Sequence, residues 1–267
     1  MPTPLQLLLD PISLTVFALY GVLILLEAVS PARPLVPVRG WRWKGLTAFA
    51  AYFFLSSYLP LLWTERLSQY QLFDLTGLGR WSGAVVGILV YEFGVYVWHR
   101  AMHTSDRLWR VFHQLHHSAE RMDTYGAFWF SAMDIVGFTV LYSLALTLVV
   151  GLSAEAATMT FYIAMFLAIF QHTNIRTPQW LGYIVQRPES HSVHHQRGVH
   201  AWNYSDLPVF DLLFGTFRNP RDYAPVQGFY DGASSRIVDL HLWRDVANAP
   251  LGRENEGAVM RQAREGA

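Results

Sequence analysis

Histidine clusters are the part of this sequence whose residue types and spacing point to chemistry. The chain has 267 residues and 11 histidines, and eight of these histidines lie in three short clusters. The clusters read HRAMH at 99–103, HQLHH at 113–117 and HSVHH at 191–195. Histidines three or four residues apart share one face of a helix, so two of their imidazoles can bind the same ion. The spacing therefore predicts a site for zinc, copper, iron or nickel, the metals that imidazole suits.

A ninth histidine, His172, is isolated in the sequence but follows an apolar segment at 156–171. That segment is just long enough to cross a bilayer at about 1.5 Å per residue, so we expect it to bring His172 to the depth of His99. Because one ion takes about four to six ligands, nine histidines at one depth predict two ions. We expect the remaining two, His200 and His241, to be hydrogen-bonded fillers. The predicted metal ligands are His99, His103, His113, His116, His117, His172, His191, His194 and His195.

Apolar segments are predicted to position these clusters. Only 15% of the residues are charged and 52% are hydrophobic, whereas ordinary soluble domains carry roughly 25% charge. The shortage of charge is concentrated in five apolar segments, and apolar segments of about this length are typical of bilayer-spanning helices. The sequence therefore predicts an all-α integral membrane protein with four to five transmembrane helices and a histidine-rich cap for two metals. The predicted spans are 12–29, 45–63, 82–98, 127–150 and 156–171.

The distribution of positive charge predicts the orientation of this multi-pass protein. The linker before the second span holds four basic residues and no acid, which favours the cytoplasmic side. The chain then alternates across the bilayer, with Gln71 outside and every histidine cluster on the cytoplasmic face. We expect one membrane domain over 1–267, in which the first span is a retained helix and not a signal peptide. Its predicted parts are an N-terminal helical hairpin (1–81), a histidine-box catalytic core (82–217) and a cytoplasmic C-terminal tail (218–267), solvated from 249 onward.

The composition excludes several classes of function. The chain has no cysteine, which excludes disulfides, thiolate metal sites and iron–sulfur clusters. Its formal net charge of +0 excludes a nucleic-acid binder that works through a basic face. A membrane metal transporter with a histidine relay is an alternative. That alternative would distribute its ligands through the membrane, whereas these histidines gather at one face.

Two further polar residues, Glu92 and Asn174, are candidate catalytic residues beside the histidines. Glu92 lies seven residues before His99, so two helical turns place both on one face. We expect its carboxylate to accept a hydrogen bond from a ligand imidazole, with a helix–helix hydrogen bond as the alternative. Asn174 follows His172 closely and could also cap the preceding helix. The intramembrane acids Glu27 and Asp134 are expected to pair with neighbours.

Other residues near the clusters are expected to support the site or to line it. Asn203, Tyr204 and Asp211 are expected to pin the C-terminal segment beneath the metals. An aromatic set could line a substrate slot that faces the lipid, or could form an interfacial belt. This aromatic set comprises Trp98, Trp109, Phe112, Phe128, Trp129 and Phe130.

The clusters and their surroundings resemble the fatty acid hydroxylase/sterol desaturase superfamily. The shared pattern is HxxxH, HxxHH and HxxHH, with the third cluster beyond a hydrophobic hairpin. The resemblance extends to the flanking sequences and covers about residues 82–217. These flanking sequences are YEFGVYVWHR at 91–100, HHSAE at 116–120, RPESHSVHH at 187–195, NY at 203–204 and FDLLFGT at 210–216.

The resemblance implies a membrane-bound, non-haem di-iron oxygenase. It implies two iron ions, replaceable by zinc on purification, with O2 as co-substrate. The implied reaction is hydroxylation or a related oxidation of a lipid-like substrate from the bilayer, with desaturation as the alternative. The chain shows no flavin or nicotinamide fingerprint, so electrons must come from a ferredoxin, rubredoxin or cytochrome b5 type of protein. Superfamily members often have another histidine shortly after the position of His172, where this chain has Asn174 and Arg176.

Overall fold

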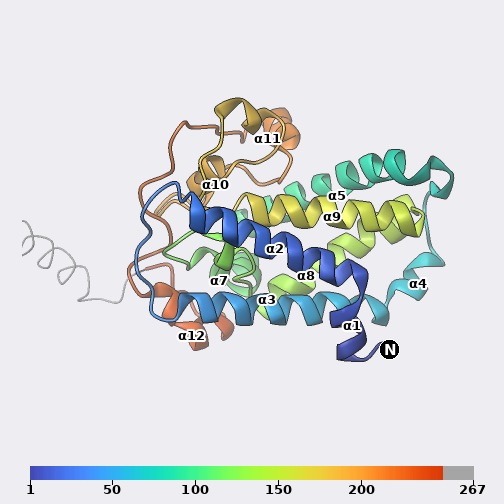
Figure 1. Ribbon diagram of the computed structural model, residues 1–267, viewed down its shortest axis with the longest axis horizontal. Helices are drawn as coiled ribbons and strands as arrows, with labels where there is room; N and C mark the ends of the chain where they lie inside the picture. The colour runs from blue at the N-terminus through green and yellow to red at the C-terminus, as the bar shows by residue number, and fades with distance from the viewer. Residues whose placement is uncertain (249–267) are drawn as a thin grey trace, which may run out of the picture.

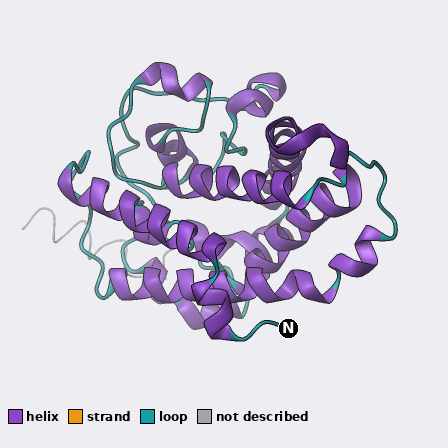
Figure 2. Cartoon of the chain, turned by 45° about the vertical axis from the view of Figure 1, so that its right-hand side comes forward, coloured by secondary structure: helices purple, strands orange, loops and turns teal. Residues whose placement is uncertain are grey.

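Long helices run side by side and carry short helices and loops at one end (Figures 1 and 2). The computed structural model describes residues 1–248, so the predicted solvated tail at 249–267 lies outside the described residues. Within residues 1–248 the chain forms no β-strand, and one isolated bridge pairs Gln196 with Gln227. The all-α prediction is therefore confirmed.

Four helical segments are long and apolar enough to cross a membrane. They contain α2 (Pro11–Val29), α3 (Trp41–Tyr58) with η1 (Leu59–Leu62), α5 (Gly79–Thr104), and α8 (Ala132–Ser143) with η5 (Leu144–Val150). The fifth predicted span corresponds to α9 (Ala154–Phe170), a shorter apolar helix. The prediction of four to five spans is therefore confirmed. Helix α8 begins later than the predicted span at 127–150, because the Ser131 side chain caps it by accepting a hydrogen bond from the Asp134 amide.

Short elements connect the long helices and build the cap. Prolines begin three of them, Pro4 in α1, Pro188 in α10 and Pro208 in α11, at the first helical position, where the missing N–H costs no hydrogen bond. The short elements are α1 (Pro4–Leu9), α4 (Thr64–Ser68), η2 (Thr76–Leu78), α6 (Asp106–Leu108), η3 (Trp109–His113), α7 (Gln114–His117), η4 (Thr124–Gly126), η6 (Gln179–Tyr183), α10 (Pro188–His194), α11 (Pro208–Phe214), η7 (Ala233–Ser235) and α12 (Ile237–His241).

Small residues let α5 and α9 approach closely. A β-carbon on Gly83 would lie 2.7 Å from Cβ of Ala156, and one on Gly87 would lie 2.5 Å from Oγ1 of Thr160. This spacing of glycines four residues apart is the small-residue pattern that brings membrane helices together. The contact matters for the site because α5 carries His99, and His172 follows the end of α9.

The first part of the predicted C-terminal tail packs against the cap. Gln114 of α7 donates a hydrogen bond to the Arg244 carbonyl at 2.8 Å and accepts one from the Val246 amide at 2.8 Å. Leu240 and Val246 are buried. The division of the chain at 218 stays a prediction, but the end of the described chain, at residues 240–246, packs against α7.

Candidate metal centre

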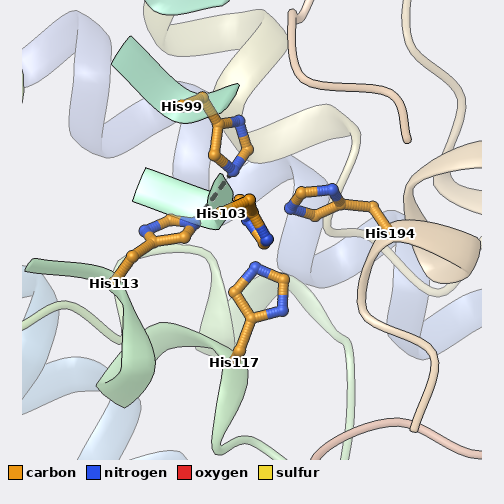
Figure 3. A group of neighbouring side chains, drawn as sticks. All are labelled: His99, His103, His113, His117 and His194. Carbon is orange, nitrogen blue, oxygen red and sulfur yellow. Dashed lines mark hydrogen bonds between the residues drawn. The ribbon is translucent and has the colours of Figure 1, made fainter. Parts of the chain in front are cut away.

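The structure brings the nine predicted ligand histidines together in two groups. Within each group, one nitrogen from every imidazole lies within 4.8 Å of the others. The five histidines of the first group surround a common centre in Figure 3. The five-histidine group is His99, His103, His113, His117 and His194, and the four-histidine group is His116, His172, His191 and His195.

The two HxxHH clusters contribute to both groups in a reciprocal pattern. In the cluster at 113–117, the first and last histidines belong to the five-histidine group and His116 belongs to the other. In the cluster at 191–195, the first and last belong to the four-histidine group and His194 belongs to the other. Residues four apart share a helix face, whereas adjacent residues point in different directions. Each cluster therefore bridges the two groups and fixes the spacing between them.

The nitrogen atoms are placed as ligands of an ion would be. Nε2 of His172 lies 3.1 Å from Nε2 of His116 and 3.1 Å from Nε2 of His191. Two nitrogens at right angles, each about 2.1 Å from one ion, would be about 3.0 Å apart. Buried nitrogens without a hydrogen bond are costly, and an ion would satisfy them. Those without a partner among the described residues include Nε2 of His103, His117 and His194.

Burial keeps these imidazoles neutral. It lowers the pKa of His172 to about 4 and holds the pKa of His117 and His191 well below the usual value for histidine. Neighbouring imidazoles lower the pKa of His117 and His191 further, since two positive charges at this distance repel. Neutral imidazole is the form that binds metal ions. The donor set therefore fits two ions without any prior loss of protons.

The loop at 200–204 orients three histidines of the five-histidine group. Three of its backbone carbonyls accept the Nδ1 protons of ligand histidines, which leaves each Nε2 lone pair free for an ion. The carbonyl and Nδ1 pairs are His200 with His103 at 2.8 Å, Trp202 with His194 at 2.7 Å, and Tyr204 with His99 at 2.8 Å.

Positive φ angles aim these carbonyls. His200, Trp202 and Asn203 have φ angles of 43°, 74° and 52°, a region that residues other than glycine rarely adopt. The loop contains no glycine, so this conformation could not be predicted from the residue types. Asp211 holds it in place by accepting hydrogen bonds from the amides of Tyr204 at 2.9 Å and Ser205 at 3.0 Å.

Glu92 holds the same loop and does not contact a ligand imidazole directly. It is fully buried in α5, and its Oε2 accepts hydrogen bonds from Ser205 Oγ and the Asp206 amide, each at 2.9 Å. Its Oε1 has no partner among the described residues. The expected direct contact is thus replaced by an indirect one, because the loop that Glu92 holds carries the Tyr204 carbonyl to His99.

Two residues outside the predicted ligand set contact the ligand histidines. Asp134 is fully buried, and its Oδ2 lies 3.0 Å from Nδ1 of His113. His200 is half-buried, and its Nδ1 lies 3.0 Å from Nδ1 of His117. The sequence signals for these roles were an acid inside an apolar span and a histidine soon after the third cluster. Both residues were expected only to pair with neighbours or fill space.

Asn174 and Arg176 do not reach the histidines. The Asn174 side chain donates a hydrogen bond to the Arg33 carbonyl at 2.8 Å, and Arg176 is ion-paired with Asp222 at 2.6 Å. Asn174 therefore links the end of α9 to the linker after α2, and its catalytic role stays a prediction. The position where superfamily members often have another histidine follows His172, which belongs to the group with four histidines.

A cavity of about 70 Å³ lies beside both groups. Histidines of both groups line it, together with apolar side chains that include Phe128, Phe130 and Phe138. Phe128 and Phe130 belong to the aromatic set that was predicted to line a substrate slot, whereas Trp109 packs against the rings of His103 and His117. The arrangement therefore places an apolar compartment next to a donor set for two ions.

The part of the chain that carries the histidines matches a known protein family. Residues 84–216 match the family model described as fatty acid hydroxylase. The ornithine lipid hydroxylase OlsE of Rhizobium tropici is 34% identical over 146 residues, which cover 51% of this chain and 42% of that protein. The alkylglycerol monooxygenase of Homo sapiens is 32% identical over 169 residues, covering 61% and 35% of the two chains.

A third relative is named as a desaturase. The Delta(7)-sterol-C5(6)-desaturase of Nicotiana tabacum is 26% identical over 144 residues, covering 51% of this chain and 50% of that protein. The chain thus spans between about a third and a half of the length of these relatives. No solved structure matches the chain. Through residues 84–216, with all three histidine clusters and His172, the chain belongs to the fatty acid hydroxylase/sterol desaturase superfamily.

Proposed function

We propose that this protein is a membrane-bound oxidoreductase that hydroxylates a lipid-like substrate with O2 at a centre of two iron ions. The observation that carries the proposal is the meeting of two groups of buried histidines beside an apolar cavity. The relatives named as an ornithine lipid hydroxylase and an alkylglycerol monooxygenase support a lipid as the substrate. Nine histidines would hold the ions, five around one and four around the other.

The residues of the chain would hold and orient the reacting groups. Bound iron would supply the electron transfer to O2 and the oxidising power for a C–H bond that no side chain has. The carbonyls of the loop at 200–204 hold Nδ1 protons, and Asp134 holds the proton on Nδ1 of His113, so the ring orientations are fixed. Phe128, Phe130 and Phe138 would exclude water and hold an apolar chain near the ions.

Lipid analysis with labelled oxygen tests the proposed reaction. Cells that express the chain are compared, under 18O2, with cells that express a His194→Ala variant. A lipid that gains one 18O atom only with the intact chain supports hydroxylation. Unchanged lipids in cells whose purified protein contains two metals per chain would contradict the proposal. Metal analysis with one ion or none in fully loaded protein would contradict the two-ion centre.

Desaturation is the second candidate, because one relative is named as a sterol desaturase. The same lipid analysis separates the two reactions. A desaturated product loses two hydrogen atoms and gains no 18O, whereas a hydroxylated product gains the label.

We further propose that the histidines face the cytoplasm and receive electrons there from a ferredoxin, rubredoxin or cytochrome b5 type of protein. The four basic residues in the linker before α3 and in its first turn support this orientation, since positive charge is retained on the cytoplasmic side. Accessible tags test it: a tag at Lys44 should be reached from the cytoplasm, and one at Gln71 from the opposite side. A cytoplasmic tag at Gln71 would overturn the orientation.

A further inference from the structure

A second, larger chamber lies next to the cavity beside the histidines. It measures about 300 Å³, which is the size of a small ligand site. The two cavities share four lining residues, and each cavity has further lining residues of its own. The shared residues are Tyr52, Tyr91, Phe138 and Ala168. The two cavities therefore adjoin across these four side chains, and the larger one extends from them into the bundle, toward Thr64 of α4 and Thr147 of η5.

Residues that carry a hydroxyl group are the majority of those that line this larger chamber. Nine of its fifteen lining residues are Ser, Thr or Tyr, and none is Asp, Glu, Lys, Arg or His. The hydroxyls come from α3, α4, α5, α8 and η5, so no one helix accounts for them. They are Tyr52, Ser56, Ser57, Thr64, Tyr91, Thr139, Tyr142, Ser143 and Thr147.

Most of these hydroxyls already donate their protons within the protein. Ser57, Thr64 and Ser143 each donate to the carbonyl four residues earlier in the chain, at 2.7, 2.7 and 3.0 Å. Such a hydroxyl has used its donor but keeps lone pairs that can accept a further hydrogen bond. The side chains of Tyr91, Thr139 and Thr147 make no hydrogen bond with the described residues, so these three hydroxyls can both accept and donate. The wall is therefore uncharged and rich in acceptors.

We propose that this chamber binds a neutral hydrogen-bond donor, such as a hydroxyl group, at the end of the lipid substrate remote from the carbon that is oxidised. An uncharged wall at membrane depth disfavours a carboxylate or phosphate group, whose burial without a cation is costly. A purely hydrocarbon end would leave the hydroxyl acceptors unused. This inference rests on the proposed function, since it assumes that the oxidised carbon lies in the compartment beside the histidines.

Binding of chain-length-matched probes to the metal-loaded protein tests the proposal. Octanol, dodecanol and hexadecanol, each radiolabelled, are compared with the alkanes and the carboxylates of the same length by scintillation proximity in detergent. At the chain length that binds best, the alcohol should bind about two- to tenfold more tightly than the alkane, as expected for one neutral hydrogen bond. The carboxylate should bind more weakly than both.

A double variant, Thr139→Val with Thr147→Val, assigns the preference to the chamber. These substitutions keep the side-chain shape and remove two hydroxyls that have no hydrogen-bond partner among residues 1–248. The variant should keep two metals per chain and its affinity for the alkane, but should lose most of its preference for the alcohol. Thr15→Val is the matched control, because Thr15 is exposed on α2 and does not line the chamber.

Three results would overturn the proposal: equal binding of alcohol and alkane at every length, tightest binding of the carboxylate, or an undiminished alcohol preference in the double variant. The 18O2 experiment judges the proposed function separately. Labelled lipid without an alcohol preference would overturn only the assignment of the chamber. An alcohol preference without any O2-dependent oxidation of lipid would support the chamber and overturn the proposed function.

Discussion

Asp134→Asn tests whether a carboxylate behind a ligand histidine sets the affinity of one metal. Oδ2 of Asp134 lies 3.0 Å from Nδ1 of His113, and both side chains are almost completely buried. A carboxylate in this position fixes the ring and raises its strength as a ligand. An amide of the same shape can still accept the proton but carries no charge, so both effects weaken.

The expected loss follows from the behaviour of such outer contacts. Removing one typically costs 10–100-fold in metal affinity or activity, which is about 1.4 to 2.8 kcal/mol. Because His113 belongs to the five-histidine group, only the ion in that group should bind more weakly. Titration of the loaded protein with a competing chelator, followed by metal analysis, should show one ion lost earlier and the other retained.

Glu27→Gln is the control for this experiment. Glu27 is a half-buried acid of α2 that accepts hydrogen bonds from the Thr124 amide and hydroxyl at 2.8 and 2.6 Å, and from the Asn174 amide at 3.1 Å. It has no contact with a ligand histidine, so its variant should release both ions at the wild-type chelator concentration. Equal weakening of both ions in Asp134→Asn, or no weakening of either, would refute the reasoning.

Three further variants test other parts of the structure. His172→Ala should lower metal occupancy in the four-histidine group and abolish turnover. His241→Ala should do neither, because His241 is exposed and its side chain bonds only within its own helix. Two retained metals and full activity in His172→Ala would show that the eight clustered histidines suffice to bind both ions. Gly87→Val should lower the free energy of unfolding by about 1–3 kcal/mol, because it overpacks the contact of α5 with α9. Gly21→Val should not, because a β-carbon at Gly21 would have no atom within 4 Å. Equal melting temperatures of the two variants would contradict the close contact. Glu92→Gln should lower stability by about 1–3 kcal/mol, and a loss of activity at unchanged stability would instead favour direct action on a ligand histidine.

The fixed loop at 200–204 explains how a chain with few charged residues can hold a demanding donor set. Imidazoles of five residues must converge without a carboxylate behind each of them. Backbone carbonyls serve three of the five, and Asp134 serves a fourth. The fifth, His117, has His200 behind it at 3.0 Å. Every histidine of this group is therefore oriented by a contact at its Nδ1 atom. Four of the five partners at Nδ1 are uncharged groups, and the fifth is the carboxylate of Asp134.

Local sequence determined where the helices form and which histidines were candidate metal ligands. Apolar segments of bilayer length become helices because the backbone must satisfy its own hydrogen bonds there. Spacings of three and four residues place imidazoles on one helical side by geometry alone. For this reason the all-α class, the spans and the three clusters could be predicted before any contact was known. The close contact of α5 with α9 at Gly83 and Gly87 was not predicted, because the choice of partner helix depends on packing between distant segments.

Only the tertiary structure decided how the histidines divide into five and four. Adjacent residues such as His116 and His117 belong to different groups, and this depends on the position of α7 relative to α5 and α10. The orienting contacts were also out of reach, because they join residues far apart in the chain, such as Asp134 with His113 and Tyr204 with His99. Helical periodicity is a property of neighbouring residues, so it can place a ligand on a face. The partner that fixes its ring is chosen by packing between segments, which no local pattern encodes.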